Sequence, residues 1–428
     1  MSAPAHRPDS RSDAALDLLV RGRAHIFLTG RAGTGKTTLI RRFMEQAGEE
    51  AAIVAPTGVA AMNAGGQTIH SFFRLPPRLV GPRDVKRLRH AKVIRAIKTL
   101  VIDEVSMVRA DLMAAIDLSL RLNRGNEEPF GGVRIIAVGD LAQLPPVVQG
   151  DVAQYIDEEF GGPFFFNAPP VAEAGFLRLE LDTVFRQDDP DFIDILSGVR
   201  DADLTQSQAN RLNARVTQAT GFDASATHVV LTPTNEQAFR INAERLASLP
   251  GSEKSYDGAI KGEFDPRLFP TETPLMLKKG ARVMMIRNDP GGRFVNGTLG
   301  EVEDMEDGAV RVRVGSEVHR VDPVAWERVK YVYDESEKSI GQEVIGAFKQ
   351  LPLRLAWAMT VHKSQGLTLD KLYIDMGRGM FAHGQAYVAL SRARSLDGLW
   401  LSRSLRPSDL VRDPRIEGIR SVTHAAPI

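Results

Sequence analysis

The segment with the clearest chemical character is GRAGTGKT, residues 30–37. Its spacing is that of a P-loop, and a short apolar run precedes it. Glycines let backbone N–H groups turn toward phosphate oxygens, a lysine reaches the β- and γ-phosphates, and a threonine hydroxyl ligates Mg²⁺. We therefore predict an ATP and Mg²⁺ site, with Thr37 as a metal ligand. Its predicted nucleotide-binding residues are Gly30, Ala32, Gly33, Thr34, Gly35, Lys36, Thr37 and Thr38.

Two more polar groups follow apolar runs downstream. Leu100–Ile102 ends in Asp103 and Glu104, and Val138 leads through Gly139-Asp140 to Gln143. An acid at a strand end can hold Mg²⁺ while a second acid orients or deprotonates the attacking water. A glutamine amide can hydrogen-bond a γ-phosphate. Alone, each group could be a strand ending in solvated polar residues, but their place after a P-loop favours Lys36, Asp103, Glu104 and Gln143 as catalytic or metal-binding residues.

The elements that must position these residues follow from the apolar pattern. Strands are expected at 26–28, 53–55, 100–102, 135–138, 229–231, 283–286 and 372–374, with helical stretches between most of them. Such alternation predicts βαβ units and parallel sheets covered on both faces. The apolar pattern changes near Asn296-Gly297 and Asp307-Gly308, two dipeptides typical of hairpin turns. After the second, valines alternate with arginines from Val310 to Val314, as in a half-buried antiparallel strand. Residues 298–350 are therefore expected to form an antiparallel insertion in an otherwise α/β chain.

Composition excludes several classes of protein. The 428 residues carry 54 Lys or Arg against 54 Asp or Glu and contain no cysteine. A zero net charge argues against a bulk-basic nucleic-acid binder, and the lack of cysteine excludes disulfides, zinc ribbons and iron–sulfur clusters. No apolar run is long enough for a membrane span, and the polar residues 1–13 are expected to form a flexible tail rather than a secretory signal. We expect a cytoplasmic protein.

The charge is nevertheless distributed unevenly. Residues 71–100 hold nine basic residues against one acid, Asp84. These are Arg74, Arg78, Arg83, Lys86, Arg87, Arg89, Lys92, Arg95 and Lys98. A focused basic segment can bind nucleic-acid phosphates without a basic protein overall. The alternative is a solvated helix and loop.

In this order along the chain, the motifs resemble those of superfamily 1 helicases, most closely the RecD/PIF-type branch of DNA helicases. Further segments carry the likeness: 55–61 and 68–73 resemble the first DNA-contacting motif, 129–132 (PFGG) the PIF-type signature, and 184–187 (VFRQ) motif IV. Residues 360–368 resemble motif V and 387–394 motif VI. The likeness covers about residues 14–403. The likeness is specific to this family because the chain carries both HKSQG (residues 362–366) and ALSRAR (residues 389–394) after DEVSM (residues 103–107).

The resemblance implies two RecA-like parallel-sheet P-loop domains with ATP bound between them. Residues 14–180 would form the first, with a wedge insertion at about 72–98. Residues 181–297 and 351–428 would form the second, with an SH3-like β insertion at 298–350. Gly366 and the motif IV and VI arginines, Arg186 and Arg392, would complete the nucleotide site. The resemblance implies that the two arginines are catalytic residues, which supply positive charge to the phosphate from the second domain. The alternative for either arginine is a surface ion pair.

The resemblance also implies DNA contacts. The predicted DNA-binding residues are Thr57, Thr68, His70, Phe72, Phe73, His362 and Ser364. The two histidines could instead be hydrogen-bonded structural residues. One family feature is missing, because no Gln occurs before Gln46 to read adenine, and Ser12 stands about where that Gln would fall.

The leading hypothesis is therefore an ATP-dependent DNA helicase that moves 5′→3′ on single-stranded DNA and unwinds forked or tailed duplex, in repair, recombination or replication. It would act as a monomer in a bacterial-type, nucleoid-associated setting. A second hypothesis is an ATP-switched single-strand-binding module that does not unwind. A third, a P-loop NTPase acting on protein, requires the likeness in motifs V and VI to be accidental.

Overall fold

The computed structural model describes residues 10–88, 91–148, 150–217, 223–337, 339–377, 379–380 and 382–426. The chain forms two compact units. The P-loop unit comprises the described residues of Arg7–Phe185, Glu327–Ile345 and Asp413–Ile428. The second unit comprises those of Arg186–Trp326 and Gly346–Arg412. Each unit is described by itself.

The P-loop unit is built on a seven-stranded sheet in the order β21-β6-β1-β5-β4-β2-β3, in which neighbouring strands are parallel. From the edge inward and across, the strands are β21 (Thr423–Ala425), β6 (Phe176–Leu181), β1 (Ile26–Gly30), β5 (Arg134–Val138), β4 (Thr99–Ile102), β2 (Ala51–Ala55) and β3 (Gln67–Thr68). Parallel strands require crossover connections, and the helices of this unit supply them.

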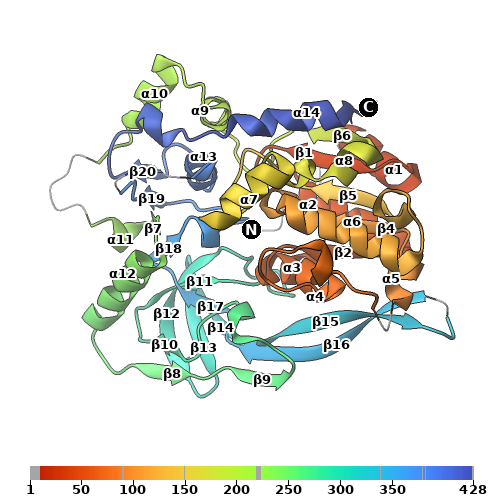
Figure 1. The fold of residues 1–428 in the computed structure, drawn as a ribbon. Coiled ribbons are helices and arrows are strands. Elements are labelled where there is room, and N and C mark those ends of the chain that lie inside the picture. Colours follow the sequence, from red (N-terminus) through yellow and green to blue (C-terminus); the bar gives the residue numbers. More distant parts are fainter. Residues whose placement is uncertain are drawn as a thin grey trace. The chain divides into compact units, whose positions relative to one another are not determined.

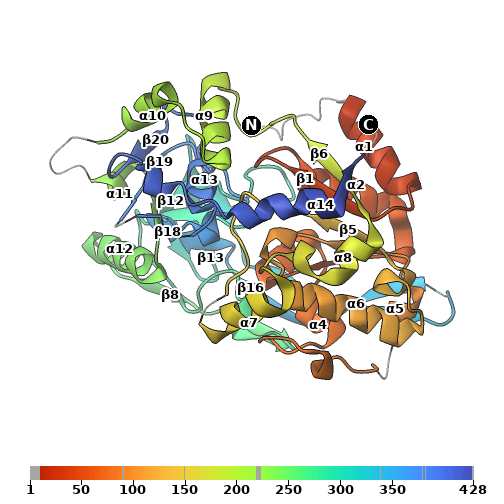
Figure 2. The same ribbon diagram turned by 45° about the horizontal axis from the view of Figure 1, so that its top comes forward.

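The helices of this unit are α1 (Ser10–Arg21), α2 (Lys36–Ala47), α3 (Gly58–Ala64), α4 (Ile69–Phe73), α5 (Lys92–Ala96), α6 (Ala110–Arg124), α7 (Asp151–Phe160), α8 (Pro169–Ala174) and α14 (Ile419–Val422). Short 3₁₀ turns lie between them: η1 (Gly48–Glu50), η2 (Pro82–Asp84), η3 (Val105–Met107), η4 (Pro129–Gly132), η5 (Phe165–Asn167) and η9 (Pro414–Gly418). α14 leads into β21 and lies near β6 in Figures 1 and 2.

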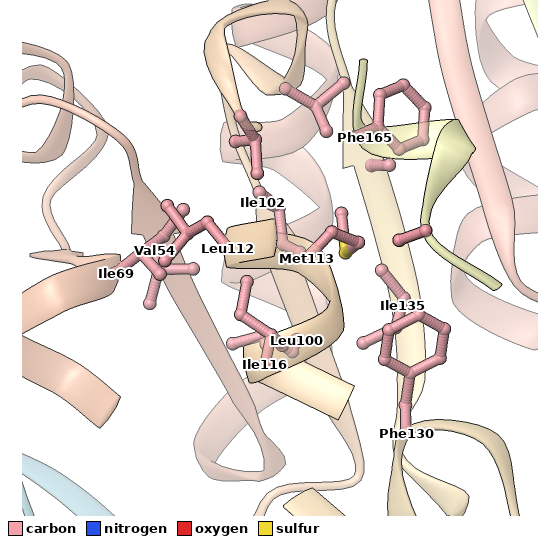
Figure 3. Packing of buried hydrophobic residues seen from close by; sticks show 14 of the residues in the cluster. Val54, Ile69, Leu100, Ile102, Leu112, Met113, Ile116, Phe130, Ile135 and Phe165 are labelled. Atoms are coloured by element: carbon pink, nitrogen blue, oxygen red, sulfur yellow. The ribbon is translucent and has the colours of Figure 1, made fainter. Parts of the chain in front are cut away.

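Successive residues of the central strands face opposite sides of the sheet, so the unit has two apolar cores. Val54, Leu100 and Ile135 face a cluster that includes residues of α4, α6, η4 and η5 (Figure 3). Ile53, Val101 and Ile136 face a second cluster that includes residues of α1 and α2. Because both faces are covered, these strands appear in the sequence as continuous apolar runs.

The second unit contains a four-stranded parallel sheet in the order β18-β7-β19-β20. Its strands are β7 (Val229–Thr232), β18 (Ala358–Thr360), β19 (Leu372–Ile374) and β20 (Leu399–Leu401). Its helices are α9 (Pro190–Asp201), α10 (Gln206–Asn213), α11 (Ala224–Thr227), α12 (Asn235–Ser248) and α13 (Gln385–Leu390), with the 3₁₀ turns η6 (Pro266–Leu268), η7 (His362–Ser364) and η8 (Pro407–Asp409). The α/β fold class with two RecA-like domains is confirmed.

The antiparallel part of the chain has three sheets. The largest follows the order β14-β13-β12-β11-β17, and its strands are β11 (Arg282–Met285), β12 (Leu299–Glu306), β13 (Ala309–Val314), β14 (Glu317–Val321) and β17 (Leu353–Leu355). A pair is formed by β8 (Lys254–Tyr256) and β10 (Leu275–Leu277). A long hairpin of β15 (Val324–Asp334) and β16 (Ser339–Gln350) continues to β9 (Ala259–Gly262).

This arrangement differs from the expected division in four places. The expected tail, 1–13, contains the start of α1 at Ser10, while residues 1–9 lie outside the described residues. β8, β10 and β11 belong to antiparallel sheets, so that architecture begins before residue 298. The segment Asp413–Ile428 groups with the P-loop unit, because β21 pairs with β6. Hairpin residues Glu327–Ile345 also group there.

The hairpin groups with the P-loop unit because it completes an apolar surface there. Tyr331 and Ile340 are buried in the core cluster on the α6 side of the sheet. β3 is only two residues long, and the N–H of Ile53 in the neighbouring strand β2 donates to the Tyr331 hydroxyl at 3.0 Å. None of the helices formed by the described residues has the length and apolar character needed to cross a membrane.

Candidate nucleotide and DNA sites

The P-loop connects β1 to α2 and depends on glycine conformations. Gly30 ends β1 with φ +148°, and a Cβ there would lie 2.4 Å from the Leu181 carbonyl oxygen. Gly33 and Gly35 have φ of +82° and +83°, which is the left-handed region that favours glycine. The helix therefore begins at Lys36 with its first N–H groups directed at the loop.

The side chains of the loop keep it in shape. The Lys36 ammonium donates to the carbonyl oxygens of Gly30 at 2.7 Å and Arg31 at 3.0 Å, which places its charge inside the loop. The buried Thr34 hydroxyl also donates to the Arg31 carbonyl, at 3.0 Å. Ala32 is buried, whereas Thr37 and Thr38 are exposed in the first turn of α2. Thr37 is thus free of the core and available as an oxygen ligand.

Asp103 and Glu104 follow β4 in the same unit. The N–H of Asp103 donates to the Val54 carbonyl at 2.9 Å, which fixes the strand end to β2. Burial raises the pKa of Asp103, while the Glu104 N–H bound to its carboxylate and the nearby Lys36 charge act in the opposite direction. A cation beside this carboxylate would stabilise its charged form.

Glu104 has φ +51°, a left-handed conformation that is uncommon for a residue with a Cβ. Such backbone conformations cost of order 1–3 kcal/mol and are found mainly at functional sites. The conformation turns the chain sharply from β4 into η3. The two carboxylates therefore lie on successive residues of a fixed turn.

Gln143 lies after β5 and is oriented by Asp140. Its amide nitrogen donates to one Asp140 carboxylate oxygen at 3.4 Å, and the other oxygen accepts the Ala142 N–H at 3.1 Å. Asp140 is 1% exposed. Gly139 lies close to the turn at residues 103–107, which we call the Walker B turn, and a Cβ on it would be 3.1 Å from the Ser106 nitrogen. The predicted residues Lys36, Asp103 and Gln143 thus lie on the loops after β1, β4 and β5, which are adjacent in the sheet.

Phe185, a residue that we did not predict for the site, lies against the loop. Its N–H donates to the Gly33 carbonyl at 2.9 Å, and a Cβ on Gly35 would lie 3.7 Å from its ring. The ring is 52% exposed, which is unusual for a large apolar side chain. The available signal was its position in the VFRQ motif, where we assigned only the neighbouring arginine.

In the second unit, Arg186 and Gln187 are docked on motifs V and VI. Arg186 donates to the carbonyl oxygens of Ser391 and Gly366, each at 3.4 Å. The buried Gln187 amide donates to the carbonyls of Ser391 at 3.1 Å and Ala393 at 3.0 Å. Burial lowers the pKa of Arg186, and Tyr387 opposes that shift. Motif IV therefore brings Arg186 next to Gly366, as the family resemblance implied.

Arg392 is 1% exposed and is held by its own surroundings. It donates to the carbonyl oxygens of Val388 at 2.9 Å and Ser364 at 3.5 Å, and to the Ser391 hydroxyl at 2.8 Å. These contacts link motif VI to motif V. They exclude the alternative of an exposed surface ion pair for this arginine.

The predicted DNA-binding threonines are helix caps. The Thr57 hydroxyl accepts the Ala60 N–H at the start of α3, and the Thr68 hydroxyl accepts the Ser71 N–H at the start of α4, both at 3.2 Å. A hydroxyl that accepts one hydrogen bond still has a proton to donate. The two residues can therefore form a cap and contact a phosphate at the same time.

His70 is a half-buried residue in the first turn of α4, directly after its cap Thr68 and Ile69. Burial and the Arg109 charge lower its pKa, and Asp111 acts in the opposite direction. Phe72 and Phe73 are 8% and 2% exposed, and Phe72 packs edge-on against Phe73 and Tyr331. Both rings belong to the core cluster, so the structure contradicts the DNA contact that we predicted for these two residues.

Motif V gives a mixed result. His362 is exposed in η7, and partial burial of its ring lowers its pKa. Ser364 is 0% exposed, and its hydroxyl donates to the Val361 carbonyl at 2.7 Å, so a DNA contact by this side chain is contradicted. Its neighbour Lys363 is exposed and was not predicted. Burial and the Arg354 charge lower the pKa of Lys363, while Glu272 acts in the opposite direction.

The basic segment of the P-loop unit is largely exposed. All the predicted basic residues within 74–98 are exposed except Arg89, which lies outside the described residues. Arg78 pairs with Asp84 at 2.6 Å, Lys98 pairs with Glu50 at 2.5 Å, and Lys92 pairs with Glu335. Surface pairs of this kind contribute only about 0–1 kcal/mol, so phosphates can replace these carboxylates.

Comparison with known proteins adds independent evidence. The PIF1-like helicase family profile matches residues 14–208. The ATP-dependent DNA helicase Pif1 of Bdellovibrio bacteriovorus is 37% identical over 416 residues, covering 94% of this chain and 89% of that protein. The chain belongs to the PIF1-like helicase family. Eukaryotic relatives are longer, and the chain spans 58–66% of their length.

Solved structures of PIF1-like helicases match over nearly the whole chain. The Bacteroides sp. Pif1 complex with ADP-AlF₄ matches with a TM-score of 0.89 and 33% identity, covering 97% of this chain and 96% of that one. The structure of Bacteroides Pif1 bound to single-stranded DNA matches with a TM-score of 0.69 at the same identity and coverage. The PIF1-like fold thus extends well beyond the residues matched by the family profile.

Proposed function

We propose that the chain is an ATP-dependent DNA helicase that moves 5′→3′ along single-stranded DNA and unwinds forked or tailed duplex. The observation that carries the proposal is the P-loop unit, in which Lys36, the Asp103–Glu104 pair and Gln143 follow neighbouring parallel strands. Family membership and the arginine-bearing motifs of the second unit support the choice of a helicase over another ATPase.

The residues of the P-loop fit a nucleotide triphosphate and Mg²⁺. Gly30 leaves room where a Cβ would meet Leu181, and the Lys36 ammonium lies within the loop. A hydroxyl on Thr37 and a carboxylate on Asp103 are the oxygen ligands that Mg²⁺ prefers. When bound, Mg²⁺ neutralises charge on the β- and γ-phosphates. We infer that Lys36 binds those phosphates, that Glu104 takes a proton from water, and that Gln143 senses the γ-phosphate.

We assign the remaining charge to the second unit. Arg186 and Arg392 are proposed to act on the γ-phosphate as always-charged, planar donors, which typically contribute 10³ to 10⁵ in rate. Arg186 is half-buried beside Gly366, whereas Arg392 donates to its own segment. Arg392 would therefore need a local rearrangement before it could contact a phosphate. The exposed ring of Phe185 is a candidate for the face of the nucleobase, since no upstream Gln is present.

The DNA track is proposed to include Thr57, Thr68 and His70 on the P-loop unit and His362 with Lys363 on the second unit. The polarity rests on the family branch alone. We further propose a monomeric, nucleoid-associated protein acting in repair, recombination or replication.

The test combines ATPase and unwinding assays on forks that carry a 5′ tail, a 3′ tail or no tail. We expect ATP hydrolysis to be stimulated by single-stranded DNA, and only the 5′-tailed fork to be unwound. Lys36→Ala should abolish both activities while DNA binding remains measurable. Stimulated hydrolysis without unwinding would favour the switched binding module, and unstimulated hydrolysis would favour an NTPase that acts on protein.

A further inference from the structure

Helix α6 connects the Walker B carboxylates to the basic segment, which we define as residues 74–98. It begins directly after the short turn that follows Glu104, and its C-terminal end lies beside α5 in Figures 1 and 2. The two helices are in contact, and Ile94 of α5 packs in the same core as Ile116 and Leu120 of α6.

Arg124, the last residue of α6, holds the end of α5. One terminal guanidinium nitrogen donates to the carbonyl oxygens of Ile94 at 2.7 Å, Arg95 at 2.8 Å and Ile97 at 3.0 Å. Its Nε donates to the Gly131 carbonyl at 2.8 Å. The carbonyls at the end of a helix lack intrahelical partners, and a cation there is favourable. One side chain thus joins α5 to the PFGG turn.

The preceding residue forms a second anchor on the same segment. The Asn123 amide oxygen accepts the Leu88 N–H at 2.8 Å, and its nitrogen donates to the carbonyls of Ser119 at 2.8 Å and Lys86 at 3.5 Å. Burial lowers the pKa of Arg124, in keeping with a guanidinium committed to protein carbonyls.

At the other end of α6, Asp111 forms a third anchor. The buried Asp111 carboxylate accepts the Val80 N–H at 2.8 Å. The backbone of the basic segment is thereby fixed at three points along one helix. Its charged side chains, among them Arg83, Lys86, Arg87 and Arg95, remain exposed.

We propose that Arg124 is a positioning residue for strand separation, which it supports by fixing the basic segment to α6 so that this surface holds the duplex arm of a fork at a constant angle. Arg124 is the last residue of α6, whereas Asp103 and Glu104 precede its first turn. This inference rests on the proposed helicase function, since only unwinding requires the duplex to be held. ATP hydrolysis and movement on single-stranded DNA do not.

The test compares Arg124→Lys and Asn123→Ala with the wild-type chain in three assays. These are unwinding of a 5′-tailed fork, hydrolysis stimulated by single-stranded DNA, and translocation measured by displacement of streptavidin from biotinylated single-stranded DNA. We expect the unwinding rate of both variants to fall at least fivefold, while hydrolysis and translocation stay within twofold. Lysine keeps the charge but cannot reach three carbonyls and Gly131 together.

The matched control is Arg121→Lys, on the same helix. Arg121 pairs with Asp117 at 2.9 Å and Glu173 at 2.8 Å and also donates to the Glu127 carbonyl, and none of these partners among the described residues belongs to α5. Its unwinding rate should stay within twofold. A proportional fall of all three activities in Arg124→Lys would show a general structural role and overturn the inference, and so would unchanged unwinding.

A second measurement separates this inference from the helicase proposal. The chain has no cysteine, so a single Arg95→Cys substitution allows one nitroxide label on α5. We expect Arg124→Lys to increase the mobility of that label in its electron paramagnetic resonance spectrum, and to leave a label at Glu45→Cys on α2 unchanged. Equal mobility with and without Arg124 would refute the positioning role. If the wild-type chain failed to unwind any fork, the helicase proposal would fall instead.

Discussion

At the scale of single residues, the charge state of Asp103 in the nucleotide site depends on two opposing effects, burial and the nearby Lys36 charge. Asp103 is largely buried, yet it lies close enough to Lys36 for that charge to favour its ionised form. Glu104 follows it in a left-handed conformation, so the chain turns sharply between the two residues. This turn supports separate roles, with Asp103 as a metal ligand and Glu104 as a base.

Replacing Glu104 by Gln should remove the base while keeping the shape of the turn. General-base catalysis is typically worth 10² to 10⁴ in rate, so we expect stimulated hydrolysis to fall at least 100-fold. Binding of a fluorescent ATP analogue should stay within about threefold of the wild-type affinity. Wild-type hydrolysis in this variant would exclude Glu104 as the base.

His25 gives the P-loop unit a predictable acid sensitivity. Its Nδ1 accepts the Ile135 N–H at 3.1 Å, and its ring stacks on Phe176. Burial, assisted by the Arg134 charge, lowers the pKa of His25 to about 4. The unfolded state binds this proton more readily than the folded state. The contribution of the neutral His25 to the free energy of unfolding is therefore fully present above about pH 6.5 and is lost as the pH falls toward 4.

The expected loss is at most roughly 3 kcal/mol, since each pKa unit corresponds to about 1.4 kcal/mol. Urea unfolding of the wild-type chain at pH 7 and pH 5 measures roughly 2 kcal/mol of it, because pH 5 lies about 1.5 units below the unfolded pKa and still above the folded one. His25→Gln keeps an acceptor without this titration, so its free energy of unfolding should change less between the two pH values. An equal change in both proteins would assign the acid sensitivity to other groups.

At the scale of elements, α6 and the turn that follows it carry the most demanding local geometry. Phe130, Gly131 and Gly132 have successive φ values of +56°, +60° and +72°. The Asp117 carboxylate holds this turn by accepting the Phe130 N–H at 2.6 Å. α6 ends at Arg124 with Gly125 as its C-cap, and the PFGG turn that follows lies against the helix end, where the Gly131 carbonyl accepts a hydrogen bond from Arg124.

Gly131→Ala should destabilise the P-loop unit more than an ordinary surface change. A Cβ there would lie 2.7 Å from the Leu120 carbonyl oxygen, and φ is positive as well. We expect a loss of about 2 kcal/mol or more, measured by chemical denaturation. Gly125→Ala is a matched control, since Gly125 also has positive φ but no atom within 4 Å of the added Cβ. Equal losses would show that only φ matters.

At the scale of the whole molecule, the net charge conceals local separation. The chain sums to zero, yet exposed basic residues dominate the basic segment. Binding to phosphates releases counterions, so the logarithm of the binding constant should fall linearly with the logarithm of the salt concentration, with a slope of about −0.7 per phosphate contact on single strands and −0.9 on duplex.

Replacing Lys86 and Arg87 together by Ala should reduce the steepness of this slope on forked DNA by roughly 1.4 to 1.8, the value for two contacts. Fluorescence anisotropy across a salt series measures it. Lys371→Ala serves as the control, because Lys371 is exposed at the start of β19, away from the strand ends that precede motif V. A slope that the double substitution leaves unchanged would exclude the basic segment from DNA binding.

The sequence by itself determined the P-loop, the order of the motifs and the α/β character of both halves. These features are local: the glycine spacing of residues 30–37 encodes the loop, and buried parallel strands read as apolar runs such as Leu100–Ile102. β11 shows the limit of this signal, because the same kind of run at Val283–Met285 belongs to an antiparallel sheet.

Only the tertiary structure decided which side chains are available. Phe72, Phe73 and Ser364 have residue types suited to DNA, but all three are buried. Tyr331, which is distant in sequence, packs against Phe72. Phe185 remains exposed beside the P-loop, and Arg124 collects carbonyls from a helix some 30 residues earlier. No local sequence pattern indicated that β21 and the hairpin residues Glu327–Ile345 group with the P-loop unit. Residue type and spacing specify local chemistry, whereas burial depends on contacts between distant segments that no local pattern contains.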